Sequence, residues 1–173
     1  MSAESLRARI REVPDFPKPG ILFYDITTLL KDADAFHEAI QLMLEPFKED
    51  HVDVVVGMES RGFIFSAPMA YELGAGLVPV RKLGKLPAET LSVEYALEYG
   101  SNTLEIHRDA IQAGQKVLIV DDLLATGGTV LGTIELVKML KADVAGLAFL
   151  VELLFLKGRE RLGDYTTHSV IQY

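Results

Sequence analysis

Residues 117–129 read VLIVDDLLATGGT, and this stretch decides the fold class. It opens as an apolar, β-branched run, continues through two carboxylates, and ends in a loop of small residues. The apolar run predicts a buried strand over Lys116–Val120, and a helix is predicted to start near Gly128 and to continue over Thr129–Leu140. A strand that leads through a short loop into a helix is typical of the βαβ units of a parallel sheet.

The loop at the end of this strand has the composition of a phosphate site. Gly127 and Gly128 allow a ligand to approach the backbone closely, and the threonines beside them add hydroxyl donors. A helix start also exposes unpaired N–H groups at the positive end of the helix dipole. Together these features predict a phosphate cradle, and the plain alternative is a strand, turn and helix with an ordinary cap.

Two carboxylates, Asp121 and Asp122, lie just upstream of this loop. Successive side chains of a strand point to opposite faces, so we expect the two to diverge at the strand end, outside the core. Carboxylates in this position suit sugar hydroxyls or a magnesium-bound ligand better than a second phosphate. A sugar phosphate, with its hydroxyls near the acids and its phosphate in the loop, satisfies both halves of the pattern.

The same alternation of strand and helix patterns continues along the chain. Short β-branched runs predict strands at 52–57, 77–80 and 144–150, and apolar spacing predicts helices at 5–13, 35–48 and 62–73. Residues 83–102 show no clean period and are predicted to form a long excursion. We therefore predict an α/β fold with a central parallel sheet flanked by helices, in which ligands bind in the loops beyond the carboxyl ends of the strands.

Composition limits the classes of protein that remain. The chain has 173 residues and a net charge of −8, which argues against a nucleic-acid surface and against an anionic membrane surface. A hydrophobic content of 49% excludes general disorder, and the length suits one domain over residues 1–173. There is no Cys, which excludes thiolate chemistry and favours a reducing cytoplasm. No targeting segment is visible, and the longest apolar run, Val144–Leu156, is too short to span a membrane.

Several segments resemble one known family. The stretch at 117–129 is similar to the phosphoribosyl-pyrophosphate signature of type I phosphoribosyltransferases. FPKPGILFYDITTLL, VVGMESRGFIF, RKLGKLP, LEYG and LVELLFLKGRERL resemble segments of the adenine phosphoribosyltransferases, in the same order. The resemblance covers nearly the whole chain and implies a type I phosphoribosyltransferase fold, with a small N-terminal hood at about residues 1–34 and a flexible lid at about 83–102.

The resemblance also implies an activity. Members of this family transfer the 5-phosphoribosyl group from phosphoribosyl pyrophosphate to N9 of adenine, giving AMP and pyrophosphate in purine salvage. The reaction is implied to need Mg²⁺, which the substrate carries without direct protein ligands. The four histidines of the chain are scattered, and no pair of them has helical metal spacing.

Site residues follow from the matching motifs. The 5-phosphate is expected at Ala125, Thr126, Gly127, Gly128 and Thr129, and the ribose hydroxyls at Asp121 and Asp122. The pyrophosphate is expected at Glu59, Ser60, Arg61, Arg81, Lys82 and Lys85. Arg61 and the lid residue Glu98 are implied to be catalytic, and a cis peptide is implied at Glu59–Ser60. The segment RKLGK is implied to reach partly into the active site of a neighbouring subunit, so the resemblance implies a homodimer.

Adenine recognition is expected in the hood. Phe23 is implied to stack on one face of the purine and Leu123 to cover the other, while main-chain groups of Leu22 and Tyr24 read its edge. The plain alternative for Phe23 is a core aromatic residue. Many relatives carry Arg at the position of Tyr24, so any side-chain contact of that residue is in question.

Two other functions remain open on the sequence alone. One is a phosphoribosyltransferase for another purine, such as hypoxanthine or xanthine, which the hood PGILFYDI argues against. The other is a regulator that binds phosphoribosyl pyrophosphate and controls transcription, which is expected to carry a DNA-binding segment or a basic face. Turnover of a panel of nucleobases separates all three.

Overall fold

The computed structural model describes residues 2–96 and 101–173. The chain divides into two compact units, Met1–Leu42 and Met43–Tyr173. The predicted hood lies within the first unit, which also contains most of helix α3 (Ala33–Leu44). The predicted phosphate loop and the predicted pyrophosphate residues all lie in the second unit.

The first unit contains two short helices, α1 (Ala3–Arg7) and α2 (Thr27–Leu30), and an antiparallel ribbon of β1 (Arg11–Pro14) and β2 (Leu22–Asp25). The helix predicted over residues 5–13 is therefore wrong beyond Arg7. Residues 11–13 belong to the ribbon instead. There the Nη2 atom of Arg11 lies 3.0 Å from Oδ2 of Asp25 on the facing strand. This cross-strand pairing outweighs the local helix propensity of a short polar segment.

The second unit is built on a sheet of seven strands among the described residues, in the order β5-β6-β4-β3-β7-β8-β9. Five strands run parallel: β3 (Val54–Met58), β4 (Gly76–Lys82), β7 (Lys116–Leu124), β8 (Asp143–Glu152) and β9 (Thr167–Gln172). Every residue of β3 is buried, as expected for a central strand covered on both faces. The predicted parallel sheet flanked by helices is confirmed.

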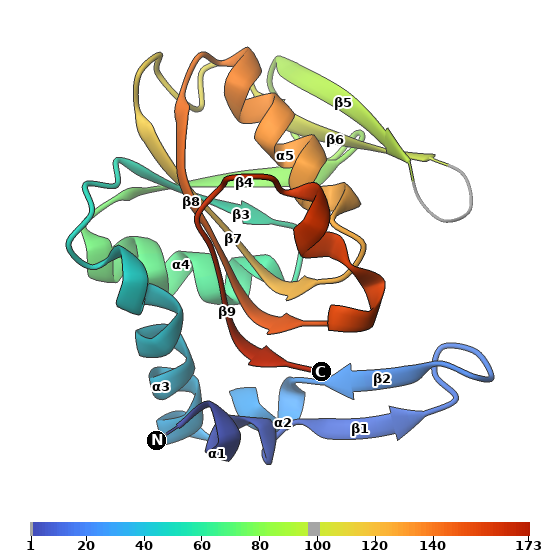
Figure 1. Ribbon diagram of the computed structural model, residues 1–173. Coiled ribbons are helices and arrows are strands. Elements are labelled where there is room, and N and C mark those ends of the chain that lie inside the picture. The colour runs from blue at the N-terminus through green and yellow to red at the C-terminus, as the bar shows by residue number, and fades with distance from the viewer. Residues whose placement is uncertain (1, 97–100) are drawn as a thin grey trace. The chain divides into compact units, whose positions relative to one another are not determined.

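Two helices cover this sheet. Helix α4 (Gly62–Leu73) connects β3 to β4, and α5 (Gly128–Met139) connects β7 to β8. The two connections start from neighbouring strands and move in opposite directions along the sheet, so right-handed crossovers place the helices on opposite faces (Figure 1). The boundary between β3 and β7 is therefore a topological switch point, the place where ligands bind in open α/β sheets.

The predicted excursion at 83–102 contains regular structure. Strand β5 (Thr90–Ala96) pairs antiparallel with β6 (Ser101–His107), and this hairpin extends the sheet beyond β4. The prediction of an irregular segment was wrong. Leu91, Val93 and Tyr95 alternate with polar residues, and this two-residue period is typical of a strand with one buried face. Their apolar side chains pack against the buried cluster around β6 and α5.

The remaining predicted elements lie close to the observed ones. Strand β9 and the two short 3-10 helices η2 (Leu154–Leu156) and η3 (Gly158–Arg161) were not predicted, while a further 3-10 turn, η1 (Glu45–Phe47), ends the helix predicted at 35–48. Strand β7 runs four residues further than predicted, so both aspartates lie inside it. Among the described residues, no helix is long and apolar enough to cross a membrane.

Candidate active site

The loops that follow β3 and β7 meet at the switch point of the second unit. Helix α4 begins directly after the first loop, and its first residue, Gly62, approaches Asp121 of β7 closely. A Cβ atom at Gly62 would lie 2.7 Å from Asp121 Oδ1 and 3.2 Å from the Val120 carbonyl oxygen. Glycine is thus needed here for the two loops to lie side by side.

The second loop has the shape predicted for a phosphate cradle. Gly127 adopts φ +84°, a conformation that favours glycine, and it is the N-cap of α5. A cavity of about 60 Å³ lies against the loop and the first turn of the helix. The residues predicted for the 5-phosphate all line it: Ala125, Thr126, Gly127, Gly128 and Thr129. The unpaired N–H groups of a helix start are the donors that a phosphate requires.

The paired carboxylates lie beside this cavity. Asp122 is 5% exposed, and its Oδ2 forms an ion pair with Arg61 Nε at 3.0 Å. Asp121 Oδ1 accepts the backbone N–H of Asp122 at 2.9 Å. The expectation that both side chains lie outside the core is therefore wrong for Asp122, because β7 continues past both aspartates to Leu124, paired with β8.

Burial shifts the ionisation of both carboxyls. Desolvation and the neighbouring charge of Asp122 raise the pKa of Asp121 well above its ordinary value. Burial also raises the pKa of Asp122, although Arg61 opposes that shift. The unliganded site therefore holds negative charge at an energetic cost, which hydroxyl donors or a cation can offset.

This cost predicts a stability effect. The folded-state pKa of Asp121 lies above its unfolded value, so the stability that depends on its protonation is present at low pH and is lost as the pH rises through the folded-state pKa. At pH 7 the carboxylate then lowers the free energy of unfolding. Asp121→Asn keeps an oxygen that can accept the Asp122 N–H, and we expect it to raise Tm at pH 7 by about 2–4 °C, equivalent to about 1 kcal/mol.

Thermal unfolding measured from pH 3 to pH 8 tests this expectation. The difference between Asp121→Asn and the unchanged protein should shrink towards pH 3, where the carboxyl is protonated in both states. The exposed Asp109→Asn serves as the control, and its Tm should follow that of the unchanged protein. A Tm gain for Asp121→Asn that is the same at every pH would exclude ionisation as its cause.

The loop after β3 carries a carboxylate surrounded by cations. The Glu59–Ser60 peptide is cis, as the resemblance implied. The Glu59 side chain is 6% exposed and accepts from Lys85 Nζ at 2.6 Å, from the Lys82 backbone N–H at 2.7 Å and from Arg81 Nε at 3.3 Å. Burial opposes ionisation of Glu59, but these donors together hold its pKa below the ordinary value. Glu59 thereby fixes the RKLGK segment next to the loop.

A cleft of about 370 Å³ connects these features within the second unit. The predicted site residues that line it are Glu59, Arg61, Lys82, Asp121, Asp122, Leu123, Ala125 and Thr129. Three further lining residues, Tyr95 on β5 and Asn102 and Leu104 on β6, were not predicted as site residues. The alternating pattern of β5 was the sequence signal that could have placed this hairpin at the site.

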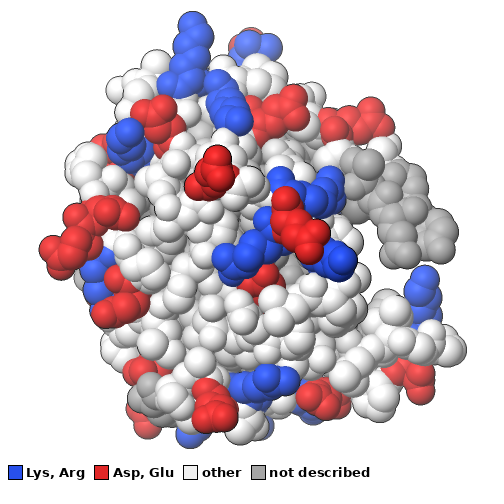
Figure 2. Space-filling view, in the orientation of Figure 1, with Lys and Arg blue, Asp and Glu red and all other residues white. Residues whose placement is uncertain are grey.

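The surface charge has the same mixed character. Figure 2 shows acidic and basic side chains interspersed over the face that it draws, with one group in which blue side chains lie around red ones. The ion pairs of Glu59 with Arg81 and Lys85 and of Asp122 with Arg61 are arrangements of this kind. Cations held by carboxylates are positioned for an anion without forming a broad basic surface.

The residues predicted for adenine fall in both units. Leu22, Phe23 and Tyr24 lie on β2 of the first unit, where the Phe23 ring packs edge-on against Phe16 with centroids 5.1 Å apart. Leu123 lies on β7 of the second unit and lines the cleft. The stacking of Phe23 and Leu123 on one purine stays a prediction. Glu98 lies outside the described residues, and its role stays a prediction as well.

A glycine loop at a helix start, beside paired carboxylates and at the switch point of a parallel sheet, suits a ligand that combines a phosphate group with sugar hydroxyls. Residues 26–171 match the family described as "Phosphoribosyl transferase domain". The adenine phosphoribosyltransferase of Chloroflexus aurantiacus is 57% identical over 173 residues, which cover 100% of both chains. The chain belongs to the adenine phosphoribosyltransferase family.

Solved structures agree with this membership. The adenine phosphoribosyltransferase of Thermoanaerobacter pseudethanolicus has a TM-score of 0.96 and 53% identity, covering 99% of this chain and 100% of that chain. The enzyme of Saccharomyces cerevisiae, complexed with an imino-altritol bisphosphate and adenine, has a TM-score of 0.91 and 42% identity, covering 97% of each chain. The likeness therefore extends over both units of the chain.

Proposed function

We propose that this chain transfers the 5-phosphoribosyl group from phosphoribosyl pyrophosphate to N9 of adenine, giving AMP and pyrophosphate. Sequence similarity to adenine phosphoribosyltransferases over the whole length of the chain supports the reaction and its place in purine salvage. The observation that carries the site assignment is the cleft in which the glycine loop at 125–129, the carboxylates of Asp121 and Asp122, and Arg61 come together. It offers separate places for the phosphate, the sugar and the leaving group of this substrate.

Each part of the substrate has a proposed place. The 5-phosphate binds the N–H groups of loop 125–129, and the ribose hydroxyls donate to Asp121 and Asp122. These two interactions bracket the sugar and so fix C1′ in the cleft. The bond between C1′ and the pyrophosphate oxygen breaks, and its electron pair leaves with the pyrophosphate. The lone pair of N9 forms the new bond to C1′, and a proton leaves the imidazole side of the base.

The leaving pyrophosphate needs positive charge and N–H donors. We place it at the loop of Glu59, Ser60 and Arg61 and near the cationic segment of Arg81, Lys82 and Lys85. Arg61 contributes a guanidinium whose geometry suits phosphate oxygens, and it is already oriented by Asp122 at 3.0 Å. A cation fixed in advance stabilises the charge that develops on the leaving group without reorganising during the reaction.

Magnesium fits this donor set as a partner of the substrate. Mg²⁺ is usually held by one or two carboxylates together with substrate phosphates, and Asp121 and Asp122 line the same cleft as the proposed phosphate positions. Among the described residues, no group of three or more His, Asp or Glu side chains could hold a metal by itself. Bound with the substrate, Mg²⁺ would neutralise charge on the pyrophosphate as it departs.

Two further parts of the proposal rest on the family resemblance or on the composition of the sequence. The first is a homodimer in which RKLGK reaches the neighbouring active site, and the second is a cytoplasmic location. Arg81 and Lys85 are paired with Glu59 within the chain, so a role in the neighbouring site would require them to exchange this partner.

A panel of nucleobases tests the function. With phosphoribosyl pyrophosphate and Mg²⁺, we expect equal amounts of AMP and pyrophosphate from adenine, and at least about 10⁴-fold lower kcat/KM with hypoxanthine or guanine, because a 6-oxo purine leaves backbone groups of the reading edge unpaired. Excess chelator should abolish turnover. Equal turnover of hypoxanthine would favour the other-purine alternative, and binding without turnover of any base would favour a regulator.

A further inference from the structure

The backbone of the phosphate loop rests on a segment from the C-terminal part of the chain. This segment, Gly158–Arg161, forms the 3-10 helix η3. A Cβ atom at Gly158 would lie 2.2 Å from the Ala125 carbonyl oxygen and 3.1 Å from the Gly127 nitrogen. A Cβ atom at Gly127 would in turn lie 3.0 Å from the Gly158 carbonyl oxygen. The two backbones therefore touch, and glycine is required on both sides.

Arg161 links the same two segments through a hydrogen bond. Its Nη1 donates to the Thr126 carbonyl oxygen at 2.8 Å, although the arginine is otherwise exposed. The Thr126–Gly127 peptide is trans, so its N–H points away from its carbonyl group. Because Arg161 holds the carbonyl, it also fixes the direction of the Gly127 N–H, one of the donors in the cradle.

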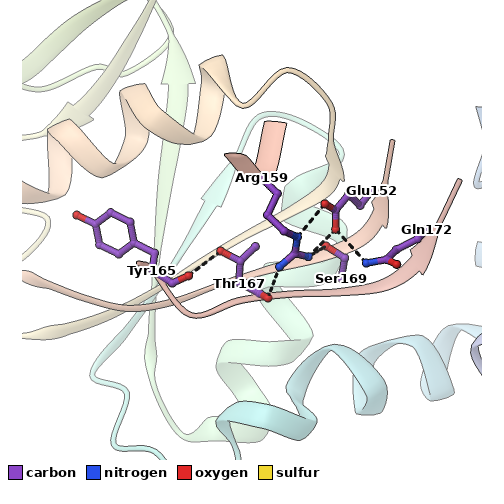
Figure 3. Close-up of polar contacts among 6 residues, drawn as sticks. All are labelled: Glu152, Arg159, Tyr165, Thr167, Ser169 and Gln172. Atoms are coloured by element: carbon purple, nitrogen blue, oxygen red, sulfur yellow. Dashed lines mark hydrogen bonds and ion pairs between the residues drawn. The ribbon is translucent and has the colours of Figure 1, made fainter. Parts of the chain in front are cut away.

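An ion pair between Arg159 and the buried carboxylate of Glu152 anchors the segment to the sheet (Figure 3). Arg159 donates through Nε to Glu152 Oε1 at 2.8 Å and through Nη1 to the Thr167 carbonyl oxygen at 2.7 Å. Its Nη2 contacts Glu152 Oε2 at 2.5 Å and Ser169 Oγ at 3.1 Å. Glu152 ends β8 and is 2% exposed, while Thr167 and Ser169 belong to β9. The forked guanidinium thus joins η3 to two neighbouring strands.

We infer that Gly158 and Arg161 are positioning residues, which hold the phosphate loop in the shape that binds the 5-phosphate. This inference rests on the proposed location of the 5-phosphate at loop 125–129. A loop whose donors are fixed before binding does not lose conformational freedom when the ligand arrives, and affinity rises accordingly. The effect should be confined to ligands that carry the sugar phosphate, since η3 contacts none of the residues proposed for pyrophosphate in the hydrogen bonds and ion pairs of the described chain.

Calorimetric titration with ribose 5-phosphate and, separately, with pyrophosphate tests the inference. Arg161→Gln should weaken ribose 5-phosphate binding about tenfold, in the range for a lost hydrogen bond from a charged donor. Arg161→Lys keeps one charged donor and should lose less, about threefold. Pyrophosphate affinity should change by less than about twofold in both variants, and Tm should stay within about 2 °C because Arg161 is exposed.

Two further variants make the result decisive. Arg108→Gln removes another exposed arginine and should leave both affinities unchanged. Thr129→Val removes a hydroxyl from the loop itself and should weaken ribose 5-phosphate binding if the loop is the 5-phosphate site. If Thr129→Val weakens binding and Arg161→Gln does not, the positioning role is overturned and the loop assignment stands. If neither variant weakens binding, the loop assignment falls and the positioning role falls with it.

Discussion

Asp121→Asn combined with Asp122→Asn is expected to weaken binding of phosphoribosyl pyrophosphate by at least about 100-fold. Each carboxylate offers a charged acceptor to a ribose hydroxyl, and the loss of such a hydrogen bond costs about 1.5–3 kcal/mol. Two losses amount to about 3–6 kcal/mol, which corresponds to about 150-fold or more in affinity. Titration calorimetry with the magnesium complex of the substrate measures this change directly.

The fold of this double variant should survive. Asparagine keeps the size and one acceptor oxygen of each side chain, and Arg61, which loses its charged partner, is 44% exposed and can be solvated. The matched control is Asp50→Asn with Asp109→Asn, which makes the same change of charge at two exposed positions. Wild-type affinity in the Asp121/Asp122 variant, together with a Tm at or above that of the unchanged protein, would remove these residues from the ribose site.

Glu98→Ala is expected to lower kcat by about 100-fold or more, the usual contribution of a positioned acid–base group. The family resemblance places Glu98 at the acidic residue of the lid, where a carboxylate could manage the proton that leaves the base or stabilise nearby positive charge. The KM for phosphoribosyl pyrophosphate should change far less, because the proposed binding groups for this substrate lie in the loops of the second unit. Steady-state kinetics with adenine varied and then with phosphoribosyl pyrophosphate varied separate the two effects.

Glu94→Ala is the matched control for Glu98. Glu94 is an exposed carboxylate on β5, and its side chain accepts a hydrogen bond from the Ser101 hydroxyl across the hairpin. We expect its removal to leave kcat within about twofold, as is usual for surface substitutions. If Glu98→Ala behaves like Glu94→Ala, Glu98 is not the chemical group of the lid.

Much of the sheet could be predicted from sequence because its central strands are short, β-branched and buried. The runs at 52–57 and 116–120 mark β3 and β7, and the helix predicted at 62–73 matches α4. Strands that are stabilised mainly by pairing with another strand were missed. Strands β1 and β2 depend on each other, and β9 (Thr167–Gln172) has no apolar run of its own and depends on pairing with β8.

The candidate site also has parts that could be predicted from local sequence and parts that depend on residues distant in the sequence. The candidate phosphate loop and the helix start behind it could be located from the sequence, because two glycines and flanking hydroxyls directly precede an apolar helical pattern. Arg61 pairs with Asp122, which is 61 positions further along the chain, and Glu59 pairs with Lys85, which is 26 positions further along. Only the arrangement of the strands brings these partners together. The same holds for Arg161, whose contact with Thr126 spans 35 positions.

A crystal structure of the protein with AMP tests the site assignment most directly. We predict that the phosphate oxygens of AMP lie within about 3 Å of backbone N–H groups in residues 126–129, and that the ribose hydroxyls contact the carboxylates of Asp121 and Asp122. The cleft beside Arg61 should remain free for pyrophosphate. The protein used for crystallisation should first be shown to make AMP from adenine. If AMP then binds with its phosphate away from residues 125–129, the account is contradicted.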